Sequence, residues 1–414
     1  MTATIAPARR SRLGLPALAG HRRLVAGNLI DSVGNGMLLP LGLLYFTTVQ
    51  HLPMATVGTA VTLGQFAALP VTFLAGYVMD RRSPKYLTTS ANILSAAGFL
   101  TFLTARTAWQ VALCYLLVQS GINAFYTAQR TLITHTTPPE QRRAWFAFMS
   151  SLRNAGIGAG AALASALLAA FGTRALTWLV ALAAPLYLLA AVCYAGLTTT
   201  PPPPAVEATP GNVTRADHNR RYLLLVACTV PYVLAQAMLS VLVALYTTRS
   251  LHLPAYAAGI LLIVNTAFVS ALGAPLNARL APRRPRAAVA LGYTLLIAAM
   301  ALFALPALPL LGFTAWPALM AGIVVFSLAE VFISPAVNEL SVTLTPQAAK
   351  GSRQSLFQLS FSAGFIAAPA LFTTLLAHGQ LLPWLAQAAA CLLALAAVPA
   401  LKSPNRHRRR NPRR

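Results

Sequence analysis

Two carboxylic acids lie inside long apolar segments of this chain, where acids are rare. The 414 residues include only seven acids, and Asp31 and Glu330 are the two that fall well within such segments. An ionised carboxylate in the middle of a bilayer costs at least about 2.5–3.5 kcal/mol, so it needs a partner, a wet cavity or a proton. Both acids are therefore candidates for proton coupling. The structural alternative for Glu330 is a permanently protonated acid that hydrogen-bonds a neighbouring helix.

One basic residue, Arg153, also lies inside an apolar segment. Asp31 is about seven residues and Arg153 about nine residues into segments that enter from the same side, which at 1.5 Å per residue places both about 10–14 Å deep. An ion pair between them is thus possible, and a lone intramembrane arginine needs a partner. A static pair would be structural, whereas a pair that breaks when Asp31 takes up a proton would be a coupling element. The sequence leaves both alternatives open.

Polar side chains recur at spacings of four in every third apolar segment, beginning with the first. Residues four apart share one face of a helix. The stripes are Asp31 and Asn35; Gln119 and Asn123; Tyr232, Gln236 and Ser240; and Glu330, Ser334 and Asn338. A single stripe usually links two helices, but four at equal spacing along the chain favour a shared aqueous cavity that these residues line.

The composition indicates a membrane protein. Hydrophobic residues make up 57% of the chain and charged residues 9%, with a mean hydropathy of +0.65, which excludes an ordinary soluble domain. A spanning helix needs about 20 mostly apolar residues. Twelve segments qualify, near 24–46, 55–79, 84–104, 109–129, 144–170, 175–197, 221–246, 255–279, 287–308, 316–342, 353–376 and 380–401. The predicted fold class is an all-α membrane protein with twelve transmembrane helices.

A repeat divides these helices into two halves. Tyr45, Thr47, His51, Leu52 and Pro53 each recur 201 positions later, in the stretch from 246 to 254. Two like halves in a membrane predict two six-helix bundles with a solute site between them. The predicted bundles are 24–197 and 221–401, joined by a proline-rich cytoplasmic linker, 198–220, and flanked by basic tails at 1–23 and 402–414.

The basic residues predict the orientation of the helices. Between the predicted spans and in the tails, 27 Lys and Arg residues fall on one side and three, Arg106, Arg174 and Arg249, on the other. The positive-inside rule therefore places both termini in the cytoplasm of a multi-pass cell-membrane protein. The net charge of +24 indicates contact with anionic lipid headgroups rather than with nucleic acid. The four cysteines all fall in predicted spans and predict neither a disulfide framework nor a metal site.

The loop after the second predicted span carries a family motif. Gly76, Asp80, Arg81 and Lys85 match the Gly-x-x-x-Asp-Arg-x-Gly-Arg-Lys/Arg signature, while Ser83 and Pro84 stand where that signature has Gly and Arg. With twelve spans and a six-plus-six repeat, the whole chain resembles the major facilitator superfamily. The resemblance implies that Asp80 latches the cytoplasmic ends of the two halves together, near the start of the eleventh span.

A weaker resemblance concerns the drug/proton antiporters of that superfamily. The segment from Asn154 to Gly160 is similar to their glycine-rich segment, without its characteristic Gly-Pro. The membrane-embedded arginine common on their fourth span is missing. This chain has Gln119 and Asn123 there, with Arg130 expected only at the cytoplasmic end.

The expected activity is secondary active transport by alternating access. The leading hypothesis is proton-coupled efflux of small apolar or cationic compounds by a monomer that uses the proton gradient and no cofactor. Import or facilitated passage of a small polar metabolite is the alternative, and neither direction nor substrate is deduced. A non-transporting receptor would need large soluble extensions. A polytopic membrane enzyme would need clustered ligands or a nucleophile motif, and the seven histidines lie in loops and tails.

Overall fold

The computed structural model describes residues 16, 18, 20–38, 41–198, 215–254, 256–282, 284–308, 315–345 and 350–401. Within those ranges the chain is helical, without strands. Its longer helices are α1 (Arg22–Leu38), α2 (Leu41–Thr48), α3 (Met54–Ala67), α4 (Leu69–Arg81), α5 (Pro84–Phe102), α6 (Ala108–Thr136), α7 (Arg142–Phe171), α8 (Arg174–Ala195), α9 (Arg215–Leu245), α10 (Tyr256–Leu280), α11 (Pro285–Ala304), α12 (Ala315–Thr343), α13 (Lys350–His378) and α14 (Leu382–Ala397). Shorter ones are η1 (Pro139–Gln141), η2 (Tyr246–Ser250), η3 (Leu305–Ala307) and η6 (Val398–Ala400). Most of the predicted tail 1–23, all of the tail 402–414 and most of the linker lie outside the described residues.

Ten helical stretches in the described part of the chain are long and apolar enough to cross a membrane, and α1 with α2 makes an eleventh. The predicted span 24–46 is made up of α1 and α2, which meet at an angle of 41°. Pro40 lies between them in the sequence, and a proline interrupts the hydrogen-bond ladder of a helix. In the segment predicted as the linker, 198–220, helix α9 begins at Arg215.

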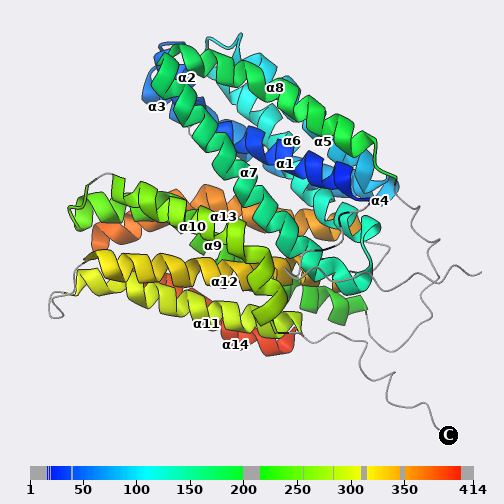
Figure 1. The fold of residues 1–414 in the computed structure, drawn as a ribbon, viewed down its shortest axis with the longest axis vertical. Helices are drawn as coiled ribbons and strands as arrows, with labels where there is room; N and C mark the ends of the chain where they lie inside the picture. The colour runs from blue at the N-terminus through cyan, green and yellow to red at the C-terminus, as the bar shows by residue number, and fades with distance from the viewer. Residues whose placement is uncertain are drawn as a thin grey trace, which may run out of the picture.

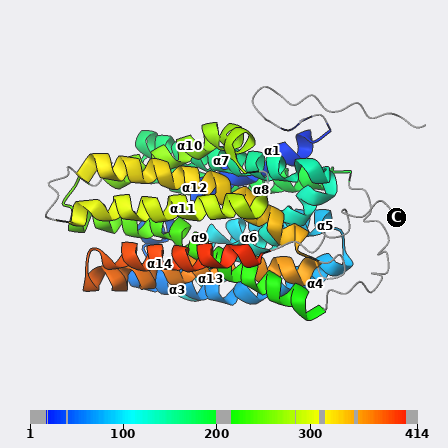
Figure 2. The ribbon, with the colours of Figure 1, turned by 90° about the horizontal axis from the view of Figure 1, so that it is seen from below.

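The helices form two groups that lie against each other (Figure 1). The N-terminal bundle comprises α1–α8 and the C-terminal bundle α9–α14, and they meet where α7 packs on α10 and α12 and where α4 packs on α13. The helices of the C-terminal bundle run along one common direction (Figure 2). The turns between helices therefore gather at two opposite ends of the molecule. We call the end with the α2–α3 and η2–α10 turns the His51 end, and the opposite end, with the α4–α5 turn, the Asp80 end.

The sequence repeat is also a structural repeat. His51 and His252, 201 positions apart, are the two described non-glycine residues with positive φ, at 54° and 50°. Around them the backbone hydrogen bonds correspond one to one: Gln50 and Leu251 donate to the carbonyls of Tyr45 and Tyr246. Leu52 and Leu253 donate in the same way to Phe46 and Thr247. The same sequence thus builds the same turn at the His51 end of each half.

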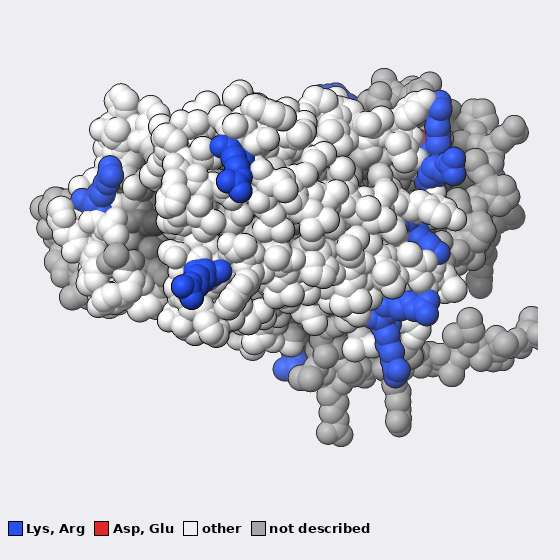
Figure 3. All heavy atoms as spheres, turned by 90° about the horizontal axis from the view of Figure 1, so that it is seen from above, with Lys and Arg blue, Asp and Glu red and all other residues white. Residues whose placement is uncertain are grey.

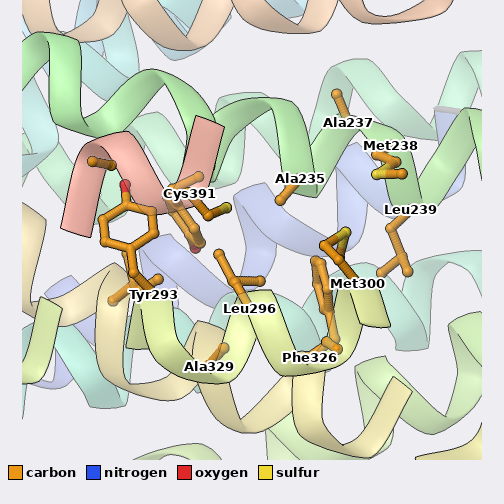
Figure 4. Packing of buried hydrophobic residues seen from close by; sticks show 14 of the residues in the cluster. Ala235, Ala237, Met238, Leu239, Tyr293, Leu296, Met300, Phe326, Ala329 and Cys391 are labelled. Atoms are coloured by element: carbon orange, nitrogen blue, oxygen red, sulfur yellow. The ribbon is translucent and has the colours of Figure 1, made fainter. Parts of the chain in front are cut away.

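Each bundle has its own apolar core. In the C-terminal bundle, α9, α11, α12 and α14 contribute the largest cluster, in which Leu296 and Met300 lie close to Phe326 (Figure 4). The cores of the N-terminal bundle centre on Phe99 and Trp145. Since lipid offers little hydrophobic driving force between helices, close packing of this kind supplies much of the association.

The outer surface is mostly uncharged. The face drawn in Figure 3 carries scattered basic side chains and almost no acidic ones. Large apolar residues such as Leu63, Val192, Ile263 and Leu393 are more than half exposed. Such a surface is suited to contact with lipid.

Candidate functional site

Glu330 lies in a buried polar cluster of the C-terminal bundle. It occupies the middle of α12 and is only 7% exposed. Asn265, on α10, donates from Nδ2 to Oε2 of Glu330 over 3.2 Å and to the hydroxyl of Ser327 over 3.0 Å. Sequence analysis missed Asn265. In the sequence Asn265 is a single amide within an apolar run, and such a residue alone does not show which neighbouring helix its side chain faces.

The predicted stripes on α9 and α12 meet in this cluster. Nε2 of Gln236 donates to the hydroxyl of Tyr232 over 3.0 Å. Gln236 also interacts with Glu330, and Tyr232 with Ser334. Tyr232, Ser334 and Glu330 are buried, whereas Gln236 remains half-buried. Three helices, α9, α10 and α12, therefore surround the acid with neutral hydrogen-bonding groups.

Asp31 and Arg153 lie near each other without a close ion pair. Asp31, on α1, is 3% exposed, and its carboxyl is within electrostatic reach of the Arg153 guanidinium. The one salt bridge within 4.0 Å among the described residues is a different pair. The guanidinium of Arg153 instead lies 5.4 Å from the centre of the Tyr126 ring. Asn35, one turn from Asp31 on α1, is half-buried.

The stripe on α6 connects the two bundles. Nε2 of Gln119 donates to Oδ1 of Asn123 over 3.1 Å. The buried Asn123 donates to the carbonyl of Ala68, where α3 passes into α4, over 3.2 Å. Ser362, on α13 of the other bundle, donates to Oδ1 of Asn123 over 2.9 Å. Asn123 is thus satisfied by groups from both bundles.

Arg130, which the sequence places toward the cytoplasmic end of its helix, has a buried side chain. It is 8% exposed and reaches from α6 into the C-terminal bundle. Its Nε donates to Oδ1 of Asn338 on α12 over 2.8 Å, and its Nη2 donates to Oε1 of Gln358 on α13 over 3.1 Å. Its Nη1 donates to the carbonyl of Tyr126 on its own helix over 2.8 Å. The count of basic residues that predicts the topology includes Arg130, but such a count does not show which helices the side chain contacts.

Two aromatic rings complete the surroundings of Arg130. Its guanidinium carbon lies 4.7 Å from the centre of the Phe357 ring and 5.4 Å from that of Phe361. Both rings belong to α13, and such cation–π contacts stabilise a desolvated guanidinium by roughly 2 kcal/mol.

Asp80 bridges the bundles at the N-terminus of α13. Its carboxylate accepts hydrogen bonds from the backbone N–H of Gly351 over 2.6 Å and of Ser352 over 3.2 Å. An anion is favoured at this position, because the first N–H groups of a helix are free and its dipole is positive there. Gly76 brings the helices together: a Cβ on it would lie 2.6 Å from the carbonyl oxygen of Gly351.

The other two motif residues face their own bundle. The guanidinium of Arg81 lies 4.0 Å from the centre of the Tyr77 ring, one turn earlier on α4. Nζ of Lys85 donates to the carbonyl of Leu197 over 2.8 Å, which ties the start of α5 to the end of α8. Of the four motif residues, Gly76 and Asp80 are therefore the two that contact the C-terminal bundle.

A further polar bridge joins α7 to the C-terminal bundle. Nε of Arg143 lies 3.7 Å from Oε2 of Glu339 on α12, and its Nη1 donates to the carbonyl of Pro282, just after α10. Together with those of Asp80 and Arg130, these contacts make up what we call the inner clasp. All three lie toward the Asp80 end, so the bundles are closed against each other there.

Among the described residues, no three His, Cys, Asp or Glu side chains are grouped so that they could hold a metal ion. The polar groups at the centre can donate and accept hydrogen bonds and, at Asp31 and Glu330, exchange a proton.

Comparison with known proteins decides the family. The Major Facilitator Superfamily model matches residues 24–308 and 225–414. The chain belongs to this superfamily. The family predicted from the Gly76–Lys85 motif is thereby confirmed.

Relatives within the superfamily are distant. The multidrug resistance protein MdtH of Edwardsiella ictaluri is 25% identical over 347 residues, 84% of both chains. The uncharacterized MFS-type transporter YhjO of Bacillus subtilis is 27% identical over 134 residues, and the match spans only 33% of that relative.

Solved structures show that the superfamily fold extends over nearly the whole chain. A bacterial homologue of the iron transporter ferroportin, in an outward-facing state, aligns with a TM-score of 0.72 at 16% identity, over 92% of this chain and 98% of the other. The superfamily transporter FucP, in an outward conformation, aligns with a TM-score of 0.69 at 17% identity over the same shares.

Proposed function

We propose that this superfamily member is a secondary active transporter in which two six-helix bundles, 24–197 and 221–401, alternate access to a solute site between them. The observation that carries the proposal is the inner clasp: three polar bridges between the bundles lie at one end of the molecule. Contacts of this kind can break and re-form as the bundles rock. The polar side chains expected to line the solute site lie on α1, α6, α9 and α12.

The proposed topology has twelve spans with both termini in the cytoplasm of the cell membrane. The twelfth is α5, whose 19 residues give a length of about 28 Å, close to the thickness of a bilayer core. Its polar residues Thr88, Asn92 and Ser95 are buried against the protein rather than exposed to lipid. The positive-inside rule assigns the Asp80 end to the cytoplasm. The structure then corresponds to a state closed toward the cytoplasm.

Proton coupling is proposed to act through Glu330, with Asp31 as the second candidate. Both carboxyls are buried, and neither has a Lys or Arg nitrogen within 4.0 Å in the described part of the chain. A buried acid without a close counter-charge favours its neutral form, while a wet cavity would restore the charged form. Opening to opposite sides can therefore change its protonation. The proton gradient would supply the energy, without a cofactor.

The proposed transport is efflux of small apolar or cationic compounds by a monomer. The name of the Edwardsiella relative, a multidrug resistance protein, supports this substrate class. An apolar solute would pack on the Leu, Val and Phe side chains near the centre, and a cationic one could pair with an ionised Glu330. Import or facilitated passage of a polar metabolite is the competing function.

Inverted membrane vesicles test the proposal. Wild-type vesicles energised by acidification of their interior are expected to accumulate rhodamine 123 or ethidium, and a protonophore should abolish the accumulation. Empty-vector vesicles are the control. Equilibration without accumulation would indicate a facilitator, and failure to move any solute of a broad panel would overturn the transport function.

A further inference from the structure

The positive charge of Arg130 is held entirely by neutral groups. Its three hydrogen-bond acceptors are the side-chain oxygens of Asn338 and Gln358 and the carbonyl of Tyr126. No carboxylate lies within 4.0 Å of it among the described residues. A buried guanidinium with neutral acceptors is stabilised less than one with an anionic acceptor, because charge-assisted bonds are about twice as strong.

Opening of the Asp80 end removes most of this support. Asn338 and Gln358 belong to the C-terminal bundle, whereas Tyr126 is on the same helix as Arg130. When the bundles separate, Arg130 keeps the bond to Tyr126 and presents its remaining N–H groups to the space between the bundles. The guanidinium fork matches a carboxylate or sulfonate in a bidentate geometry.

A second cation strengthens the preference for an anion. Arg153 lies over the ring of Tyr126, and the backbone carbonyl of the same residue accepts a hydrogen bond from Arg130. The guanidinium groups of Arg130 and Arg153 interact electrostatically. Asp31 and Glu330 act on Arg153 rather than on Arg130. The region around Tyr126 therefore carries two positive charges, and one of them, Arg130, has no carboxylate within 4.0 Å in the described part of the chain.

We propose that Arg130 binds the acidic group of an amphiphilic organic anion when the Asp80 end is open. The class is a small compound with one carboxylate or sulfonate and an apolar, preferably aromatic, body. Phe357 and Phe361 of α13 now face the guanidinium; on opening they move away with Gln358, so their rings face Arg130 from the opposite side of the space and can pack on such a body. Anion binding and closure of the inner clasp compete for the same N–H groups. The inference adds organic anions to the proposed apolar and cationic substrates and rests on the proposed alternating access.

Binding to the purified full chain in nanodiscs tests this without requiring transport. The probes are fluorescein and 8-anilinonaphthalene-1-sulfonate as anions, and rhodamine 123, which shares the xanthene core of fluorescein, as a cation. Arg130→Gln should weaken binding of both anions at least tenfold and leave rhodamine 123 within twofold. Arg130→Lys should bind both anions with an affinity between those of the wild type and of Arg130→Gln. Arg174→Gln, at an exposed arginine of the opposite end, is the matched control.

The competition between anion and clasp gives a second readout. Asp80→Asn weakens the clasp at a different point, so it should raise the affinity for both anions several-fold, because the competent state becomes more populated. Anions that fail to bind the wild type would overturn the inference, as would an equal loss of all three probes in Arg130→Gln. Anion binding in the absence of transport in energised vesicles would instead overturn the proposed function and leave the site standing.

Discussion

The carboxylate of Asp80 accepts a 2.6 Å hydrogen bond from the backbone N–H of Gly351, 271 residues further along the chain. This contact joins the end of α4 to the start of α13 and so joins the two bundles. Because the acceptor is charged and the donor belongs to a helix N-terminus, both the hydrogen bond and the helix dipole favour it.

Asp80→Asn should weaken closure of the Asp80 end. Loss of a charged hydrogen bond of about 1.5–3 kcal/mol shifts an equilibrium by roughly 10- to 100-fold. We expect unchanged expression, reduced transport and faster labelling of a cysteine placed at Ser334 by a reagent added on the cytoplasmic side. Arg81→Gln is the control, because Arg81 contacts Tyr77 of its own helix. Wild-type transport and labelling in Asp80→Asn would remove Asp80 from the mechanism.

Gly76→Ala should hold the same two helices apart. The added Cβ would lie 2.6 Å from the carbonyl oxygen of Gly351, and overpacking of this kind costs about 1–3 kcal/mol. Transport should fall, again with increased access from the Asp80 end. Gly58→Ala is the matched control, because a Cβ on Gly58 would meet nothing within 4 Å. This variant should transport like the wild type. Equal activity of the two variants would show that close approach at Gly76 is not needed.

Glu330→Gln should separate exchange from accumulation. Glutamine keeps the volume of the acid and can still bond Asn265, whose side chain now donates to Glu330 over 3.2 Å. The variant should therefore fold, bind solute and exchange it across the membrane, yet lose accumulation driven by a pH gradient.

Asp31→Asn is the comparison for that experiment, because it leaves the nearby Arg153 without an acid on its own side and lowers stability as well. If Glu330→Gln still accumulates solute while Asp31→Asn does not, at equal protein levels, Asp31 is the coupling acid. Accumulation by both variants would favour a facilitator.

Cysteine labelling in intact cells tests the topology. Cysteines at His51 and His252, in the repeated turns, should react with an impermeant maleimide added outside, because both lie at the His51 end. Cysteines at Ser83 and Gln141 should react only after the cells are opened. External labelling at Ser83 would invert the proposed orientation.

The sequence alone determined the membrane class, the repeat and the family. These features are local or statistical: the length of an apolar run sets a span, and a repeated turn carries its own residues at the same spacing. His51 and His252 adopt the same positive φ because the stretches around them repeat. The faces of α9 and α12 were also predictable, since residues four apart share one side of a helix.

Only the tertiary structure decided which faces meet. The sequence places Arg130 toward the cytoplasmic end of its helix but does not show its partners. Asn338 and Gln358 lie within hydrogen-bond distance of it because α12 and α13 pass beside α6. Asp31 and Arg153 do not come within 4.0 Å of each other, a separation that depends on how α1 and α7 are rotated. Periodicity defines a face of one helix, but the contacts across two bundles depend on helix rotation, crossing angle and the closed state of the inner clasp, and no local pattern encodes these.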